Sequence, residues 1–218
     1  MKNRMKNTLR KFILIVIAGM ALQLNAQDNA GDLLKKVIDQ TKSFPAMKVD
    51  FDYRMINHDA GIDEVKSGEV YIQGDAYKLI MAGQTVISNG NTIWTVLEDS
   101  EEVMVSDAQE GDENITPSRL LTSYYDDHKI SYYHAGRRNQ DPEIKTIELK
   151  PESGKKFSRI HIDIEEKGLH IKQFTIFDSG GNEFMYVIKK LDEKFLPDAG
   201  FFDFEEADYP NYEVIDMR

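Results

Sequence analysis

Residues 47–55 read MKVDFDYRM, and this stretch decides the fold class. Its odd-numbered positions hold Met, Val, Phe, Tyr and Met, whereas its even-numbered positions hold Lys, Asp, Asp and Arg. Strict alternation of this length predicts a β-strand with one apolar face and one solvent-facing polar face. Residues 157–164 repeat the pattern, with isoleucine at positions 160, 162 and 164. The chain is therefore expected to consist mainly of strands that each have one apolar face.

The same period of two continues through most of the chain after residue 46. Glycine-containing turns such as Asn89-Gly90-Asn91 separate the apolar stretches. Further strands are predicted at 69–73, 77–82, 85–88, 92–97, 102–106, 129–134, 145–149, 170–177 and 183–191. Successive strands begin about ten residues apart, which is too close for helical crossovers. The prediction is one large, one-sided antiparallel meander.

Two segments break this period and are predicted to be short amphipathic helices. Residues 29–43 carry apolar side chains at helical spacing and end before Pro45. Thr116 and Pro117 supply an N-cap and a first helical residue for the second helix. The apolar positions of the two helices are Leu33, Leu34, Val37, Ile38, Leu120, Leu121 and Tyr124. These side chains form either a movable cover or the ordinary docking stripe of a short helix.

The first 26 residues predict an export signal. They hold five basic residues and no acidic one, and residues 12–24 form the apolar stretch FILIVIAGMALQL before Ala26. This stretch is shorter than the roughly 20 residues that a membrane-spanning helix needs. We therefore expect a cleaved signal peptide at 1–26 and a single exported domain at 27–218.

Charge and cysteine content exclude several classes of function. Without residues 1–26, the 27 basic residues fall to 22 against 38 acidic ones, so the net charge changes from −11 to −16. A chain this acidic is not expected to bind nucleic acid or an anionic membrane surface. It has no cysteine, which excludes thiol catalysis, disulfides and thiolate metal sites. The five histidines show no metal-ligand spacing, and no metal site is predicted.

A wide sheet with one apolar face is expected to curl until that face is enclosed. Two short helices cover only part of such a face, so the interior is either an apolar ligand cavity or is filled by the many Phe, Tyr and Met side chains. The sequence leaves both possibilities open. The candidate cavity-lining residues are Val49, Phe51, Tyr53, Val70, Ile72, Leu79, Trp94, Ile160 and Ile162. Each has the alternative of being an ordinary core side chain.

Several short motifs follow one another in an order that resembles a known family. They are GEVYI at 68–72, VISNGNTIW at 86–94, TPSRLL at 116–121, LKP at 149–151, IKQF at 171–174, FDF at 202–204 and VID at 214–216. Together, rather than singly, they resemble the LolA family, the periplasmic carriers of outer-membrane lipoproteins. The resemblance covers essentially the whole chain after residue 26.

This resemblance implies a mainly β fold with short helices, an unclosed antiparallel β-barrel with an amphipathic helix lid over its concave apolar face. It implies a monomeric periplasmic carrier, not an enzyme, that uses no cofactor. The carrier takes acylated lipoproteins from an inner-membrane ABC exporter and passes them to an outer-membrane acceptor. One motif departs from the family: the arginine that holds the lid closed is absent near Gly74-Asp75, so no residue is assigned as the latch.

Three other functions stay open at the level of sequence. A lipid-binding sensor would regulate a membrane-anchored partner without transporting anything. A periplasmic hydrolase would need polar side chains that converge inside the cavity, and no catalytic residue is predicted. A structural scaffold would have a fully packed interior.

Overall fold

The computed structural model describes residues 28–108, 127–133, 141–151 and 157–218. These residues form one helix, a short 3-10 turn and one twelve-stranded sheet. The elements are α2 (Asp28–Ser43), β1 (Met47–Asn57), β2 (Ile62–Gln73), β3 (Ala76–Met81), β4 (Gln84–Ser88), β5 (Thr92–Leu97), β6 (Glu102–Asp107), β7 (His128–Tyr132), β8 (Ile144–Pro151), β9 (Phe157–Glu165), β10 (His170–Asp178), β11 (Asn182–Asp192), η1 (Glu206–Asp208) and β12 (Glu213–Asp216). All eleven predicted strands are confirmed, and β12 was not predicted.

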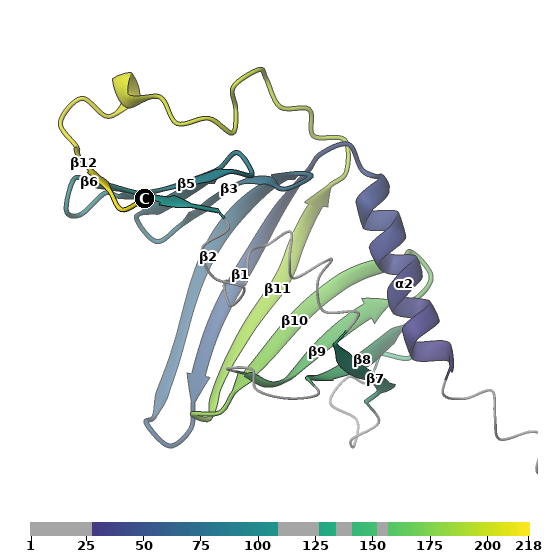
Figure 1. The fold of residues 1–218 in the computed structure, drawn as a ribbon. Coiled ribbons are helices and arrows are strands. Elements are labelled where there is room, and N and C mark those ends of the chain that lie inside the picture. The colour runs from purple at the N-terminus through teal and green to yellow at the C-terminus, as the bar shows by residue number, and fades with distance from the viewer. Residues whose placement is uncertain (1–27, 109–126, 134–140, 152–156) are drawn as a thin grey trace, which may run out of the picture.

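The strand order is β12-β6-β5-β4-β3-β2-β1-β11-β10-β9-β8-β7. Two meanders, β1 to β6 and β7 to β11, are joined where β1 pairs with β11 in antiparallel register. The two ends of the order are β12 and β7, so the described sheet curves without closing into a barrel (Figure 1). The predicted mainly β fold with an unclosed antiparallel sheet is confirmed. One pair differs from the prediction, because β12 runs parallel to β6.

The helix α2 covers one end of the concave face. Leu33, Leu34 and Val37 are each at most 4% exposed and pack on strands β8, β9 and β10. Ile160 and Ile162 belong to this cluster and lie beneath the helix. Burial of a side chain of this size contributes about 1.5–3 kcal/mol, so the stripe is sufficient to hold α2 in place. The second predicted helix, with Leu120, Leu121 and Tyr124, lies outside the described residues.

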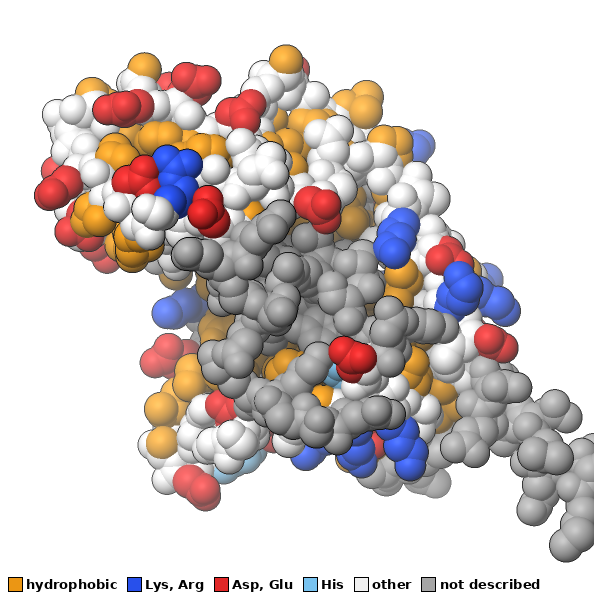
Figure 2. Space-filling model, in the orientation of Figure 1, with side chains coloured by type: hydrophobic (Ala, Val, Ile, Leu, Met, Phe, Trp, Pro, Cys, Tyr) orange, Lys and Arg blue, Asp and Glu red, His pale blue; other side chains and the backbone are white. Residues whose placement is uncertain are grey.

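The C-terminal segment between β11 and β12 covers the opposite face of strands β2 to β6 (Figure 1). Phe195 and Phe201 each lie 5.0 Å from the ring of Tyr71, and Phe204 stacks on Trp94 at 6.0 Å. The expectation of a one-sided sheet is therefore wrong for this part of the molecule. Figure 2 shows hydrophobic side chains gathered over this region, among charged ones.

The described part of the chain contains no helix with the length and hydropathy of a membrane span.

Candidate ligand-binding cavity

An apolar cavity of about 180 Å³ opens on the concave face, between the C-terminal end of α2 and strands β1, β2, β3, β10 and β11. Its lining residues, within the part of the chain that the structure describes, are Thr41, Phe44, Met47, Val49, Phe51, Val70, Ile72, Leu79, Met81, Leu169, His170, Ile171, Phe174, Tyr186, Ile188 and Leu191. Only Thr41, His170 and Tyr186 among them carry polar side-chain atoms. This composition suits the hydrocarbon part of a ligand.

Strand register brings these side chains to one face. Val49 lies opposite Val70 on β2 and opposite Leu191 on β11, and Val70 lies opposite Leu79 on β3. Directly opposed residues in an antiparallel sheet point to the same side. One row of apolar side chains therefore runs across four strands and forms the cavity wall.

An aromatic group extends the wall along β1 and β11. The ring of Tyr186 lies 6.1 Å from that of Phe51 and 5.3 Å from that of Tyr53. Burial raises the pKa of Tyr53, so its phenol stays neutral over the physiological range. Tyr53 does not line the cavity itself, but its ring packs against Tyr186, which does.

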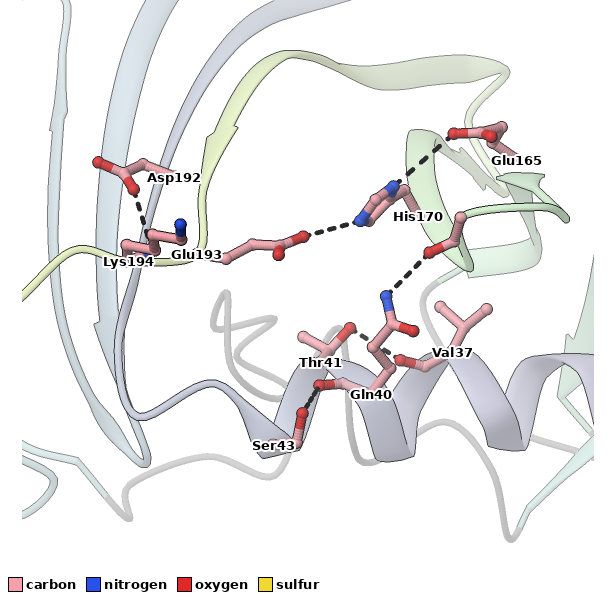
Figure 3. Close-up of polar contacts among 10 residues, drawn as sticks. Val37, Gln40, Thr41, Ser43, Glu165, His170, Asp192, Glu193 and Lys194 are labelled. Carbon is pink, nitrogen blue, oxygen red and sulfur yellow. Dashed lines mark hydrogen bonds and ion pairs between the residues drawn. The ribbon is translucent and has the colours of Figure 1, made fainter.

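The cavity has a polar edge at His170, the first residue of β10 (Figure 3). The His170 Nε2 atom lies 2.7 Å from Glu193 Oε1, and its Nδ1 atom lies 3.7 Å from Glu165 Oε2. The His170 side chain is 35% exposed although it also lines the cavity. The imidazole therefore stands at the boundary between the apolar interior and solvent.

The turn between β9 and β10 completes this edge. The Gln40 side-chain amide on α2 donates a 2.9 Å hydrogen bond to the Gly168 carbonyl in the turn (Figure 3). The next residue, Leu169, has φ of 54°, a left-handed conformation that is unfavourable for a bulky side chain, and it lines the cavity. Strain of this kind persists where surrounding contacts enforce it, so this turn is positioned by its contacts and not by its own preference.

The structure places the nine candidate lining residues in four groups, one of which is Tyr53 alone, which contacts Tyr186 beside the cavity. Five of them line the cavity: Val49, Phe51, Val70, Ile72 and Leu79. Ile160 and Ile162 face the same side of the sheet but are covered by α2. Trp94 lies on the opposite face, because it pairs with Ile87 and its neighbour Thr95 continues the row of Leu79 and Val86. That any of these residues contacts a ligand stays a prediction.

Sequence reasoning missed the contribution of β10 and β11. His170, Tyr186 and Ile188 on these strands, and Leu169 in the turn before β10, line the cavity but were not among the candidates. The alternation in residues 183–191 could have pointed to Tyr186 and Ile188, but the pairing of β1 with β11 was not foreseen. Within the described residues, no group of three or more His, Asp or Glu side chains is arranged to hold a metal ion.

Comparison with known proteins identifies the family. A family model described as "Outer membrane lipoprotein carrier protein LolA" matches residues 80–205, which is more than half of the chain. No curated protein sequence matches.

Solved structures are similar to this chain at low sequence identity. An uncharacterised conserved protein from Thermus thermophilus has a TM-score of 0.53 and 8% identity, over 84% of this chain and 98% of that one. The lipoprotein LppX from Mycobacterium tuberculosis has a TM-score of 0.50 and 16% identity, over 78% of this chain and 98% of LppX. A LolA superfamily protein from Nitrosomonas europaea has a TM-score of 0.44 and 10% identity, over 82% of this chain and 98% of that protein. With its curved open sheet, its apolar cavity and the matching family model, the chain belongs to the LolA family of outer-membrane lipoprotein carrier proteins.

Proposed function

We propose that the protein is a periplasmic carrier that binds the acyl chains of lipoproteins in the apolar cavity. It takes them from an inner-membrane ABC transporter and delivers them to an acceptor at the outer membrane. The observation that carries this proposal is the row of apolar side chains across β1, β2, β3 and β11, which encloses a cavity with a polar edge. Membership of the LolA family supports it.

The activity proposed is binding and release, without a bond being made or broken. Burying a methylene group contributes about 0.8 kcal/mol, so an acyl chain binds strongly through its length alone. A carrier must also let go of its cargo. The free energy of burial is therefore offset by a change in the protein itself, such as loss of the contacts that hold α2 and the β9–β10 turn together at the cavity edge.

The proposed mature protein begins at Gln27, after removal of the predicted signal peptide. Its net charge of −16, from 22 basic and 38 acidic residues, keeps the surface soluble and repels anionic lipid headgroups. A carrier that crosses an aqueous compartment between two membranes benefits from both properties.

Native mass spectrometry of residues 27–218, purified from the periplasm of the expressing cell, tests this proposal. We expect a bound acylated protein, whose identification would name the cargo. A bound free lipid would favour a lipid-binding sensor instead. A clean unliganded mass, with no uptake of an added N-palmitoyl peptide, would overturn the proposal.

A matched pair of variants tests the cavity itself. Ile188→Asp places a carboxylate in the half-buried cavity wall, whereas Val65→Asp changes a side chain that is 60% exposed on β2. We expect Ile188→Asp to weaken binding of the N-palmitoyl peptide at least tenfold, because a charge in an apolar wall must be desolvated by the ligand. Val65→Asp should bind as the unmodified protein does. Equal affinities of two folded variants would contradict the assignment of the site.

A further inference from the structure

The edge of the cavity at His170 has a charge that bears on ligand choice. A bound amphiphile places its hydrocarbon chain against the apolar wall and its polar end where water is accessible. His170 marks such a place, because it lines the cavity and is also 35% exposed. The Thr41 hydroxyl, which also lines the cavity, donates to the Val37 carbonyl at 2.8 Å and is therefore engaged within α2.

Two carboxylates stand beside this ring. Glu193 follows β11 and lies 2.7 Å from His170 Nε2, and Glu165 ends β9 and lies 3.7 Å from Nδ1. Their side chains are 36% and 24% exposed, so both are accessible to a polar group at the edge. One imidazole supplies at most one positive charge against two carboxylates, so the formal charges of the three groups sum to a negative value.

Neighbouring charges do not reverse this sum. Asp192 and Lys194 flank Glu193 and have opposite charges, and Figure 3 shows both beside it. In the β9–β10 turn, Glu166 and Lys167 also have opposite charges. No lysine or arginine belongs to the described cavity lining. Among the described residues of this lining, an anionic polar end would therefore meet carboxylates and no lysine or arginine.

We propose that Glu165, His170 and Glu193 make the cavity selective for acyl chains with a neutral or cationic polar end, and against free fatty-acid anions and phosphorylated amphiphiles. This inference rests on the proposed binding of acyl chains. An acyl chain joined through an ester or an amide meets the requirement, and the N–H of an amide can also donate to the Glu165 or Glu193 oxygens. The edge thus separates protein-linked acyl chains from the fatty acids and phospholipids of the same membranes.

Competition binding with three ligands that share a twelve-carbon chain tests the inference. Laurate is anionic, N-lauroyl-glycinamide is neutral and dodecyltrimethylammonium is cationic; each displaces the uncharged dye N-phenyl-1-naphthylamine below its micelle concentration. We expect the neutral amide and the cationic ligand to bind residues 27–218 at least tenfold more tightly than laurate. The preference should shrink as salt is raised, because exposed charges are screened.

Charge-removing variants assign the preference to this edge. In the Glu165→Gln/Glu193→Gln double variant, the affinity for laurate relative to that for the neutral amide should rise at least fivefold. The control is Asp63→Asn, which removes a carboxylate from the exposed Arg54–Asp63 ion pair and should leave all three affinities unchanged. Melting temperatures confirm that each variant is folded.

The possible outcomes separate this inference from the proposed function. Binding of all three ligands with equal affinity, or a preference that survives in the double variant, overturns the charge selectivity and leaves the acyl cavity intact. Failure of all three ligands to bind overturns the proposed function and this inference with it.

Discussion

Gly68 on β2 shows how one residue shapes the cavity wall. It lies opposite Phe51 on β1 and Met81 on β3. A Cβ atom at Gly68 would lie 2.9 Å from Phe51 Cζ and 3.0 Å from the Ile80 carbonyl oxygen. The carbonyl belongs to the paired strand β3 and cannot move aside easily. Glycine is therefore needed here for space, so that the Phe51 ring can lie against the strand.

Replacing Gly68 with alanine should destabilise the protein by about 1–3 kcal/mol, because overpacking forces the Phe51 ring and the β3 backbone apart. The matched control is Gly31→Ala in α2, where an added Cβ meets nothing within 4 Å. Alanine at that helical position should stabilise by about 0.5–1 kcal/mol. Urea denaturation measures both changes, and a neutral Gly68→Ala variant would contradict the close approach of Phe51.

At the scale of elements, strands β8 and β9 carry a buried carboxylate–imidazole pair on the face away from the cavity. Glu148 and His161 are directly opposed across the two strands, and their side chains lie 3.1 Å apart. They are 8% and 5% exposed, and the Tyr133 ring covers the imidazole at 4.2 Å. Burial by itself raises the pKa of Glu148, but hydrogen bonds from Lys150 and His161 outweigh burial and lower that pKa below its usual value.

A lowered folded-state pKa makes the contribution of Glu148 dependent on pH in one direction. The stabilisation is present above the unfolded pKa of about 4.5 and is lost as the pH falls through the lower folded pKa. Glu148→Gln should cost about 1–3 kcal/mol at pH 7, and its deficit relative to the unmodified protein should shrink below pH 4.5. Denaturation at pH 3.5 and pH 7 measures this. Exposed Glu98→Gln is the control, and a Glu148→Gln deficit that is unchanged at pH 3.5 would contradict the assigned contacts.

The whole molecule has two apolar faces with separate covers. The cavity and α2 occupy one face, and the C-terminal segment covers the other over β2 to β6 (Figure 1). Val96 and Val103, opposed on β5 and β6, are at most 1% exposed although they lie on the face away from the cavity. The segment then ends in β12, which pairs with β6 at the edge of the sheet. Stability and ligand binding should therefore depend on different faces.

Phe202 tests this separation. It is 7% exposed within the C-terminal segment, so Phe202→Ala should destabilise the protein by about 3–5 kcal/mol. The folded fraction should keep its affinity for the N-palmitoyl peptide, because the cavity lies on the other face. Leu196→Ala, in the same segment but 79% exposed, should change stability by less than about 0.5 kcal/mol. Loss of affinity in folded Phe202→Ala would show that the two faces are coupled.

The sequence by itself determined the class of elements and most of their positions. Alternation in 47–55 and 157–164 marked strands whose bounds agree with β1 and β9 to within two residues at most. The helical stripe of 29–43 marked α2 equally well. Local periodicity suffices for this, because an isolated segment already shows which side chains would share a face. Motif order was enough to recognise the family.

Only the tertiary structure decided which face became the cavity and which strands met. Trp94 and Leu79 both belong to alternating strands, but the pairing register puts them on opposite faces of the sheet. Trp94 stacks on Phe204, whereas Leu79 lies in the cavity wall. Ile160 has the same orientation as the cavity residues and is nevertheless covered by α2. The pairings β1–β11 and β6–β12 join segments more than 100 residues apart. Alternation with a period of two indicates that a strand has an apolar face and a polar face. What covers each face depends on contacts between segments that are distant in the chain.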